Sequence, residues 1–143
     1  MTNPMQGPGR ASELSRLTWV DLAGGHHLLA VPVGSCEQHG PHLPLDTDTL
    51  IAQAFATDLA AGRNDTFVAP TLAIGASGEH RDFPGTLSIG TAAMTATLVE
   101  LARSALPEPD SGSPAPFDAV LFVNAHGGNA EALAEARSTL EAE

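Results

Sequence analysis

The sequence predicts an α/β fold built on a mostly parallel sheet. Three apolar segments with strand character alternate with three segments of helical character along the chain, an order typical of parallel strands joined by crossover helices. Two polar clusters directly follow the first and the third strand segment. Because active sites of parallel sheets form outside the carboxyl ends of the strands, the two clusters are expected to meet at one edge.

The first strand is expected at 28–33, a continuous apolar run that Gly34 closes. This is the pattern of a strand buried on both faces. Pro32 argues against a central place in the sheet, because proline donates no hydrogen bond to a neighbouring strand. A helix is expected at 48–61, which Gly62 ends. Its helical spacing forms a mainly apolar stripe of Leu50, Ile51, Ala54, Phe55, Asp58 and Leu59.

The second strand is expected within 66–74, and it is again interrupted by a proline. The long loop 75–90 comes next, and loops of this length in a compact domain are more often functional than idle. A second helix is expected at 91–106, and Met94, Leu98 and Leu101 lie on one side of it.

A linker rich in Pro, Ser and acidic residues is expected at 107–116, exposed to solvent. The segment 118–124 is the clearest buried strand in the chain, and a last helix is expected from Ala130 onward. That helical pattern still continues at Glu143, and its acidic last turn is unfavourable at the negative end of a helix dipole. We therefore expect a domain that is truncated on its C-terminal side.

The length of 143 residues predicts one domain. Residues 1–13, rich in Gly and Pro, are expected to be a flexible N-terminal arm, and residues 14–143 to form the α/β domain. The single cysteine excludes an internal disulfide and fits a reducing cytoplasm. The N-terminus lacks the apolar run of a signal peptide. No segment approaches the roughly 18 continuous apolar residues that a membrane span requires.

The charge balance excludes two classes of partner. The chain has no lysine, and six arginines face 17 carboxylates, which gives a formal net charge of −11. This is the wrong sign for binding a phosphate backbone. Nucleic acids and anionic membrane surfaces are therefore not expected as partners.

The segment 34–48, GSCEQHGPHLPLDTD, carries the ligand types that zinc and similar divalent metals prefer. Glu37 and His39 lie two residues apart, so in an extended segment their side chains point to the same side. Asp48 begins the following helix, and His126 lies after the third strand. A bound divalent metal lowers the pKa of water to about 7 and polarises a carbonyl oxygen. The set therefore favours hydrolysis of an amide or another C–N bond.

Simpler interpretations exist for each residue. Asp48 could cap the helix that begins beside it, and loop histidines are often merely exposed to solvent. Cys36 beside His39 could be an activated nucleophile, although a small buried side chain is the plainer alternative. A histidine that binds metal cannot also serve as the base for that cysteine.

Three segments, 34–48, 75–88 and 124–129, resemble motifs of the creatininase (creatinine amidohydrolase) family in amino-acid sequence and in their order along the chain. Within that family, VPVGSCEQH at 31–39 is most similar to the peptidase subfamily of mycofactocin maturation. The resemblance implies a three-layer creatininase-like fold, a cytoplasmic metal-dependent amidohydrolase and a homo-oligomer, commonly a hexamer. It also implies two divalent metal ions per site (zinc, iron or manganese) and an amide or modified peptide as the substrate.

The resemblance further implies roles for individual residues. The metal ligands would be Glu37, His39, Asp48 and His126, with Asp48 bridging the two metals. Four further residues would contact the substrate or support the ligands, namely Glu79, His80, Gly127 and Gly128. In creatininase itself a glutamate stands two positions after the motif histidine, where this chain has Gly128. Members with the Gly-Gly form supply a glutamate from a later motif, so the shell of the second metal is expected to be incomplete here.

Two rival hypotheses remain open at the level of sequence. The chain could be a truncated fragment that binds a partner without catalysis, because it ends before any such later motif. It could also be a cysteine-dependent hydrolase, for which Cys36 would be essential and chelators harmless.

Overall fold

The computed structural model describes residues 13–22, 27–106 and 117–143, and it confirms the α/β fold. The expected arm (1–13), apart from Glu13, and the expected linker (107–116) lie outside the described residues. Glu13 forms an isolated parallel bridge with Val68. Two short 3-10 helices, η1 (Leu14–Arg16) and η2 (Trp19–Leu22), precede the sheet. Among the described residues, no helix is long and apolar enough to cross a membrane.

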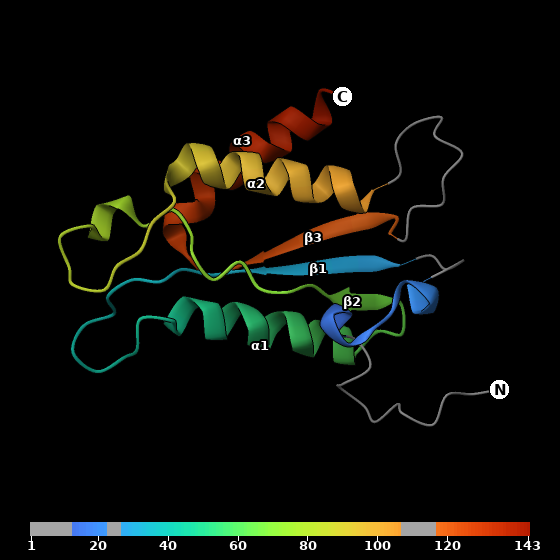
Figure 1. Cartoon of the computed structure of the whole chain (residues 1–143), viewed down its shortest axis with the longest axis horizontal. Helices are drawn as coiled ribbons and strands as arrows, with labels where there is room; N and C mark the ends of the chain where they lie inside the picture. The colour runs from blue at the N-terminus through green and yellow to red at the C-terminus, as the bar shows by residue number, and fades with distance from the viewer. Residues whose placement is uncertain (1–12, 23–26, 107–116) are drawn as a thin grey trace.

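The sheet has the parallel order β2-β1-β3, with β1 (Leu28–Val33) between β2 (Thr66–Val68) and β3 (Ala119–Asn124). The helix α1 (Thr47–Ala61) covers one face, and α2 (Gly90–Ala105) and α3 (Ala130–Glu141) cover the other (Figure 1). The carboxyl ends of β1 and β3 therefore point to the same edge. Two further 3-10 helices lie at this edge, η3 (Gly78–His80) and η4 (Gly127–Asn129).

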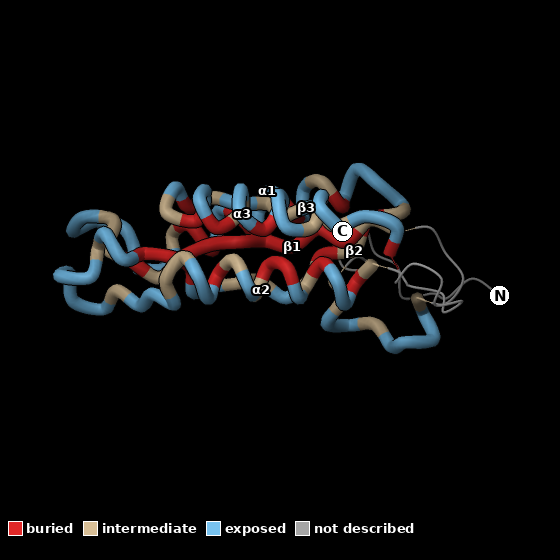
Figure 2. The backbone as a smooth tube through the Cα atoms, turned by 90° about the horizontal axis from the view of Figure 1, so that it is seen from above, coloured by how far each residue is buried: buried red, intermediate tan, exposed pale blue. Residues whose placement is uncertain are grey.

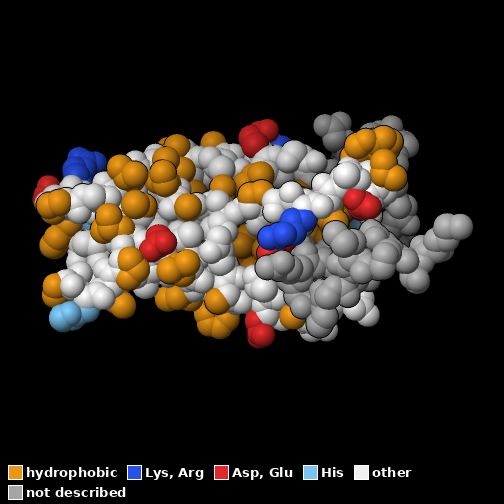
Figure 3. Space-filling view, turned by 60° about the horizontal axis from the view of Figure 1, so that its bottom comes forward, with side chains coloured by type: hydrophobic (Ala, Val, Ile, Leu, Met, Phe, Trp, Pro, Cys, Tyr) orange, Lys and Arg blue, Asp and Glu red, His pale blue; other side chains and the backbone are white. Residues whose placement is uncertain are grey.

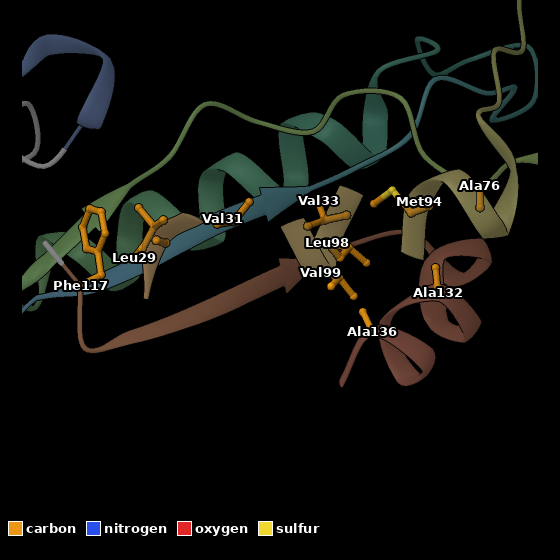
Figure 4. Close-up of a cluster of buried hydrophobic side chains, with 11 residues drawn as sticks. Leu29, Val31, Val33, Ala76, Met94, Leu98, Val99, Phe117, Ala132 and Ala136 are labelled. Atoms are coloured by element: carbon orange, nitrogen blue, oxygen red, sulfur yellow. The ribbon is translucent and has the colours of Figure 1, made fainter. Parts of the chain in front are cut away.

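The central strand β1 is buried along nearly its whole length (Figure 2). Alternate side chains of β1 enter two different cores, as strand geometry requires. Leu29, Val31 and Val33 pack toward α2 and α3 with Met94 and Leu98 (Figure 4). On the other face Ala30 packs with a smaller cluster of Ala56, Ala60 and Val68. These small side chains let α1 lie close to the sheet.

The expectation that Pro32 keeps the first strand out of the centre of the sheet is wrong. Pro32 is fully buried in the central strand, where it pairs in register with Val123. Its carbonyl accepts a hydrogen bond from the N–H of Leu72 at 3.0 Å, on the side of β2. Regular pairing with β2 ends at Val68, before the level of Pro32. The missing N–H of Pro32 therefore interrupts no regular ladder.

The second strand is shorter than the expected 66–74. It ends at Val68, although Ala69 and Leu72 still donate backbone hydrogen bonds to β1 at 2.9 and 3.0 Å. Pro70 lies between these two donors and has no N–H of its own. Proline therefore breaks the ladder while the segment continues beside β1.

The apolar spacing of 48–61 predicted the helix correctly but not its buried face. The buried residues of α1 are Asp48, Thr49, Ala52, Ala56 and Ala60. Leu50 is 50% exposed and Phe55 is 65% exposed. The bottom of the molecule, where α1 lies in Figure 1, accordingly carries many apolar side chains on its surface (Figure 3).

Two side-chain hydrogen bonds set this rotation of α1. Ser35 Oγ donates to Asp48 Oδ2 at 2.8 Å, and Thr49 Oγ1 donates to the Ser35 carbonyl at 2.9 Å. A Cβ at Gly34 would lie 2.4 Å from the Thr49 Cα, so only glycine allows this approach of α1 to the end of β1. The helix therefore turns a carboxylate, and not its bulkiest apolar residues, toward the edge of the sheet.

Candidate metal centre

The loop between β1 and α1 carries Glu37 and His39. The Glu37 N–H donates to the Leu45 carbonyl at 2.9 Å, which closes the loop across its base. Glu37 is only 5% exposed, although it is a charged residue. One ligand atom from each of Glu37, His39 and Asp48 lies within 4.8 Å of the other two. The three side chains therefore lie close together in the structure.

Asp48 lies between two imidazoles. Its Oδ1 is 2.9 Å from His39 Nε2, and its Oδ2 is 3.0 Å from His126 Nδ1. With Ser35 Oγ as a third partner, the carboxylate contacts side chains and does not cap α1. His126 is 4% exposed and comes from the loop after β3. The structure thus brings together residues far apart in sequence, as the parallel topology predicted.

The contacts extend into a row of alternating imidazoles and carboxylates. Glu37 lies beside two further imidazole nitrogens, with Oε2 at 3.3 Å from His126 Nε2 and Oε1 at 3.5 Å from His80 Nε2. The carboxylate–imidazole row therefore runs in the order His39, Asp48, His126, Glu37 and His80. Each of its two carboxylates lies between two rings, and each is a candidate for bridging two cations.

The hydrogen-bond partners of His39 and His126 favour a bound cation beside Asp48. His39 Nδ1 faces the Glu37 carbonyl at 3.0 Å while its Nε2 faces Asp48. His126 Nε2 faces the Ala76 carbonyl at 3.1 Å while its Nδ1 faces Asp48. A neutral imidazole donates from only one nitrogen, so each ring faces one acceptor that it cannot satisfy. A metal ion bound to one nitrogen of each ring would remove this conflict.

A second atom points to the same need. Glu37 Oε2 is buried and has no hydrogen-bond partner among the described residues. A buried carboxylate oxygen without a partner is costly. The donor set of carboxylate oxygens and imidazole nitrogens is one that divalent transition metals accept. The residues present therefore fit a divalent metal ion.

Glu79 and His80 reach the same centre from η3 in the long loop 75–90. Glu79 Oε1 lies 3.6 Å from His126 Nε2, and its side chain is about half exposed. His80 Nδ1 lies 3.0 Å from the Gln38 side-chain nitrogen. The loop is held against the first cluster by the hydrogen bond from the Leu87 N–H to the Cys36 carbonyl, at 2.9 Å. Both side chains therefore lie beside Glu37 and His126.

The two glycines after His126 differ. A Cβ at Gly128 would lie 2.4 Å from His126 Nε2, 2.3 Å from the Ala76 carbonyl and 2.6 Å from Glu79 Oε1. A Cβ at Gly127 would meet nothing within 4 Å. Close packing thus requires a glycine at position 128, whereas position 127 faces open space.

Sequence reasoning missed Asn129, which is fully buried. Its Nδ2 donates to the Gly34 carbonyl at 3.0 Å and to Asn124 Oδ1 at 3.1 Å, and its Oδ1 accepts from the Ala76 N–H at 2.9 Å. One amide therefore joins the three loops that build the centre. The sequence signal that could have identified Asn129 is its place in the 124–129 motif, directly before the helix that begins at Ala130.

Cys36 lies apart from these contacts. Its thiol donates to the Gly85 carbonyl at 3.7 Å, and the side chain is partly buried. This contact helps to attach the 75–90 loop. Nothing among the described contacts pairs the thiol with a histidine base.

The family model described as creatinine amidohydrolase matches residues 15–143. The chain is 53% identical over 121 residues to the mycofactocin precursor peptide peptidase of Mycolicibacterium smegmatis, a match that covers 81% of this chain and 46% of the relative. It is 45% identical over 140 residues to the same-named protein of Mycobacterium tuberculosis (strain H37Rv), covering 92% of this chain and 53% of the relative. The chain thus spans about half the length of the curated relatives it matches.

Solved structures give the same result. A crystal structure of creatinine amidohydrolase superposes with a TM-score of 0.73 at 28% identity, over 92% of this chain and 52% of that one. A structure named "Creatininase Mn" superposes with a TM-score of 0.72 at 28% identity, over 92% of this chain and 53% of that one. The names of such structures include manganese and a "Zn-Zn type". The likeness covers the sheet and both helical layers described above.

Proposed function

Because this chain belongs to the creatininase (creatinine amidohydrolase) family, we propose that it acts in a divalent-metal-dependent hydrolase of amide C–N bonds. We propose further that the substrate is a modified peptide in the maturation of mycofactocin, since relatives at 45–53% identity carry the name mycofactocin precursor peptide peptidase. A cytoplasmic location and a homo-oligomer, commonly a hexamer in the family, belong to the same proposal.

The observation that carries this proposal is the position of Asp48 between His39 Nε2 and His126 Nδ1, at 2.9 and 3.0 Å. In a metal-loaded site, Glu37, His39, Asp48 and His126 would be the ligands, and Asp48 would lie between two ions. Zinc, iron and manganese all accept such a set. When bound, the ions supply an activated water and polarise the carbonyl oxygen of the substrate.

The chain's own residues prepare this site. The Glu37 carbonyl accepts from His39 Nδ1, which leaves Nε2 free to bind a cation. Ser35 Oγ holds Asp48, so the carboxylate keeps its orientation between the rings. The Glu79 side chain is about half exposed and lies 3.6 Å from His126 Nε2, so it links the cluster to solvent. A carboxylate of the cluster is needed to carry a proton from the attacking water to the leaving nitrogen.

The test is hydrolysis of a peptide amide by the purified protein, followed by mass spectrometry with added Mn²⁺ or Zn²⁺. Chelation is expected to abolish cleavage, and His39→Ala and His126→Ala are each expected to do the same. His42→Ala is the matched control, because His42 is an exposed histidine of the same loop. Full cleavage after exhaustive chelation would refute the metal-dependent mechanism, and loss with Cys36→Ser alone would favour the cysteine-dependent one.

A second candidate function follows from length. Since the chain spans about half of its curated relatives, it could bind metal and a partner without completing a catalytic site. Metal binding in the absence of any hydrolysis would support this alternative.

A further inference from the structure

We propose that Gln38 is a positioning residue of the centre, because it fixes the tautomer of His80 so that this ring donates an N–H to Glu37 and does not itself bind a metal ion. This role rests on the proposed function, in which Glu37 is a metal ligand. It adds a task for Gln38 and a single tautomer for His80. Both can be measured in the metal-free protein, without any assay of hydrolysis.

The orientation of the Gln38 amide is set by the backbone. The N–H of Gly40 donates to Gln38 Oε1 at 2.9 Å. The opposite orientation would turn the NH₂ group of Gln38 toward this N–H, and two donors would then face each other. Gly40 lies in a turn with a φ of 71°, which glycine adopts without strain. The oxygen of the amide therefore points to Gly40, and its nitrogen is free to donate elsewhere.

The amide in turn determines the tautomer of His80. Gln38 Nε2 lies 3.0 Å from His80 Nδ1. An amide nitrogen can only donate, so Nδ1 is the acceptor and carries no proton. The one N–H of the neutral imidazole is therefore on Nε2. Two hydrogen bonds in series, from Gly40 to Gln38 and from Gln38 to His80, thus fix the position of this proton.

The ring of His80 is held in place by its own loop. Its backbone N–H donates to the Ser77 carbonyl at 3.1 Å, and its carbonyl accepts from the Phe83 N–H at 3.0 Å. The ring centroids of His80 and Phe83 are 6.0 Å apart and the rings are tilted by 50°, within the range of favourable aromatic contacts. These contacts leave the imidazole little freedom to turn Nδ1 away from Gln38.

The protonated nitrogen of His80 faces the cluster. His80 Nε2 lies 3.5 Å from Glu37 Oε1, slightly longer than a good hydrogen bond, so a small shift of either side chain completes it. Glu37 is only 5% exposed, and a buried carboxylate needs donors. Its other oxygen, Oε2, is buried without a hydrogen-bond partner among the described residues. The two oxygens are therefore divided, with Oε1 directed at the N–H of His80 and Oε2 left for a cation.

The tautomer decides what His80 can do beside a metal ion. Ligand atoms of Glu37, Glu79 and His80 lie within 4.8 Å of one another, but a histidine binds a metal only through a nitrogen without a proton. The lone pair of His80 is on Nδ1 and is directed to Gln38. His80 therefore supports a ligand as a donor, and the loss of such a support typically costs about 10–100-fold in metal affinity.

Nitrogen-15 NMR of the histidine-labelled, metal-free protein measures the tautomer, because protonated and unprotonated ring nitrogens differ in chemical shift. At about pH 9 the rings are neutral, since the ordinary pKa of histidine is about 6.5. His80 is expected to carry its proton on Nε2, and its signals are identified by their absence in His80→Gln. Gln38→Glu replaces a donor by an acceptor of the same size, so it is expected to move the proton to Nδ1. Gln53→Glu, on the exposed side of α1, is the matched control and is expected to leave the proton on Nε2.

Two further measurements test the role of His80 toward a metal ion. After Zn²⁺ is added to the labelled protein, the Nε2 proton of His80 is expected to remain, whereas the ring signals of His39 and His126 are expected to shift. Calorimetric titration with Mn²⁺ is expected to show an affinity about 10–100-fold lower in His80→Ala. His80→Gln keeps a side-chain N–H and is expected to lose less. Circular dichroism checks the fold of every variant.

A proton on Nδ1 of His80 in the unmodified protein would overturn the inference, as would a proton that stays on Nε2 in Gln38→Glu. Loss of the Nε2 proton to Zn²⁺ would also overturn it, because His80 would then be a ligand. Equal losses of Mn²⁺ affinity in His80→Gln and His80→Ala would count against the donor role. A tautomer that follows residue 38, in a protein that hydrolyses no amide, would support the inference and count against the proposed function.

Discussion

The side-chain amide of Asn129 donates a 3.0 Å hydrogen bond to the carbonyl of Gly34 and so joins the loop after β3 to the loop after β1. The same side chain accepts from the Ala76 N–H at 2.9 Å. Both partners lie in buried parts of the centre. The geometry of the candidate metal site therefore depends on one residue that is not proposed to touch a metal.

Asn129→Ala is expected to lower the free energy of unfolding by about 3 kcal/mol, because it leaves at least two buried backbone groups unpaired at about 1–3 kcal/mol each. Urea unfolding in the presence of a chelator measures the change without a contribution from bound cation. Gln53→Ala, on the exposed side of α1, is the control and is expected to stay within about 0.5 kcal/mol. Equal stabilities of the two variants would show that the Asn129 bonds are dispensable.

The sequence allowed the centre to be predicted where two local signals coincided. Glu37, His39 and Asp48 lie in one short motif, and the alternation of strands and helices placed His126 at the same edge. The contacts of Asn129 with Ala76 and of Gly128 with Glu79 join segments about 50 residues apart. Nothing in local spacing encodes such contacts, so they became visible only in the folded chain.

Gly128→Ala is expected to disturb the centre, because its Cβ would lie within 2.6 Å of His126, Ala76 and Glu79 atoms. Mn²⁺ affinity is expected to fall by at least about tenfold, the lower range for disturbed support of ligands, and the melting temperature is expected to fall with it. Gly127→Ala is a matched control one position away, where a Cβ meets nothing within 4 Å. Indistinguishable metal affinities of the two variants would contradict the close packing at position 128.

Asp48→Asn keeps the size of the side chain but removes the charge between His39 and His126. Affinity for the first Mn²⁺ is expected to fall by about 100-fold or more, because a ligand and the orientation of both rings are lost together. Asp46→Asn is the control, since Asp46 is exposed and its side chain makes no capping hydrogen bond to α1. Titration of both variants with Mn²⁺ measures the change in affinity. A loss of affinity of less than about threefold in Asp48→Asn would argue that the carboxylate only stabilises the fold.

The buried face of α1 was not predictable from apolar spacing, and this gives a last prediction. Asp48 and Thr49 are drawn to Ser35 by hydrogen bonds, which rotates Ala56 inward and Phe55 outward. Hydrophobic periodicity assumes that the largest apolar residues face the core, and here polar contacts at the helix start override it. The small alanines then pack on Ala30 of β1.

Ala56→Leu is therefore expected to cost about 1–3 kcal/mol by overpacking this contact. Phe55→Ser, one residue away on the exposed face, is expected to change stability by less than about 0.5 kcal/mol. Urea unfolding at several protein concentrations measures both. A large loss in Phe55→Ser that grows on dilution would mean that the apolar face of α1 is covered in solution by another copy of the chain. A large loss independent of concentration would mean that the helix is rotated relative to the structure.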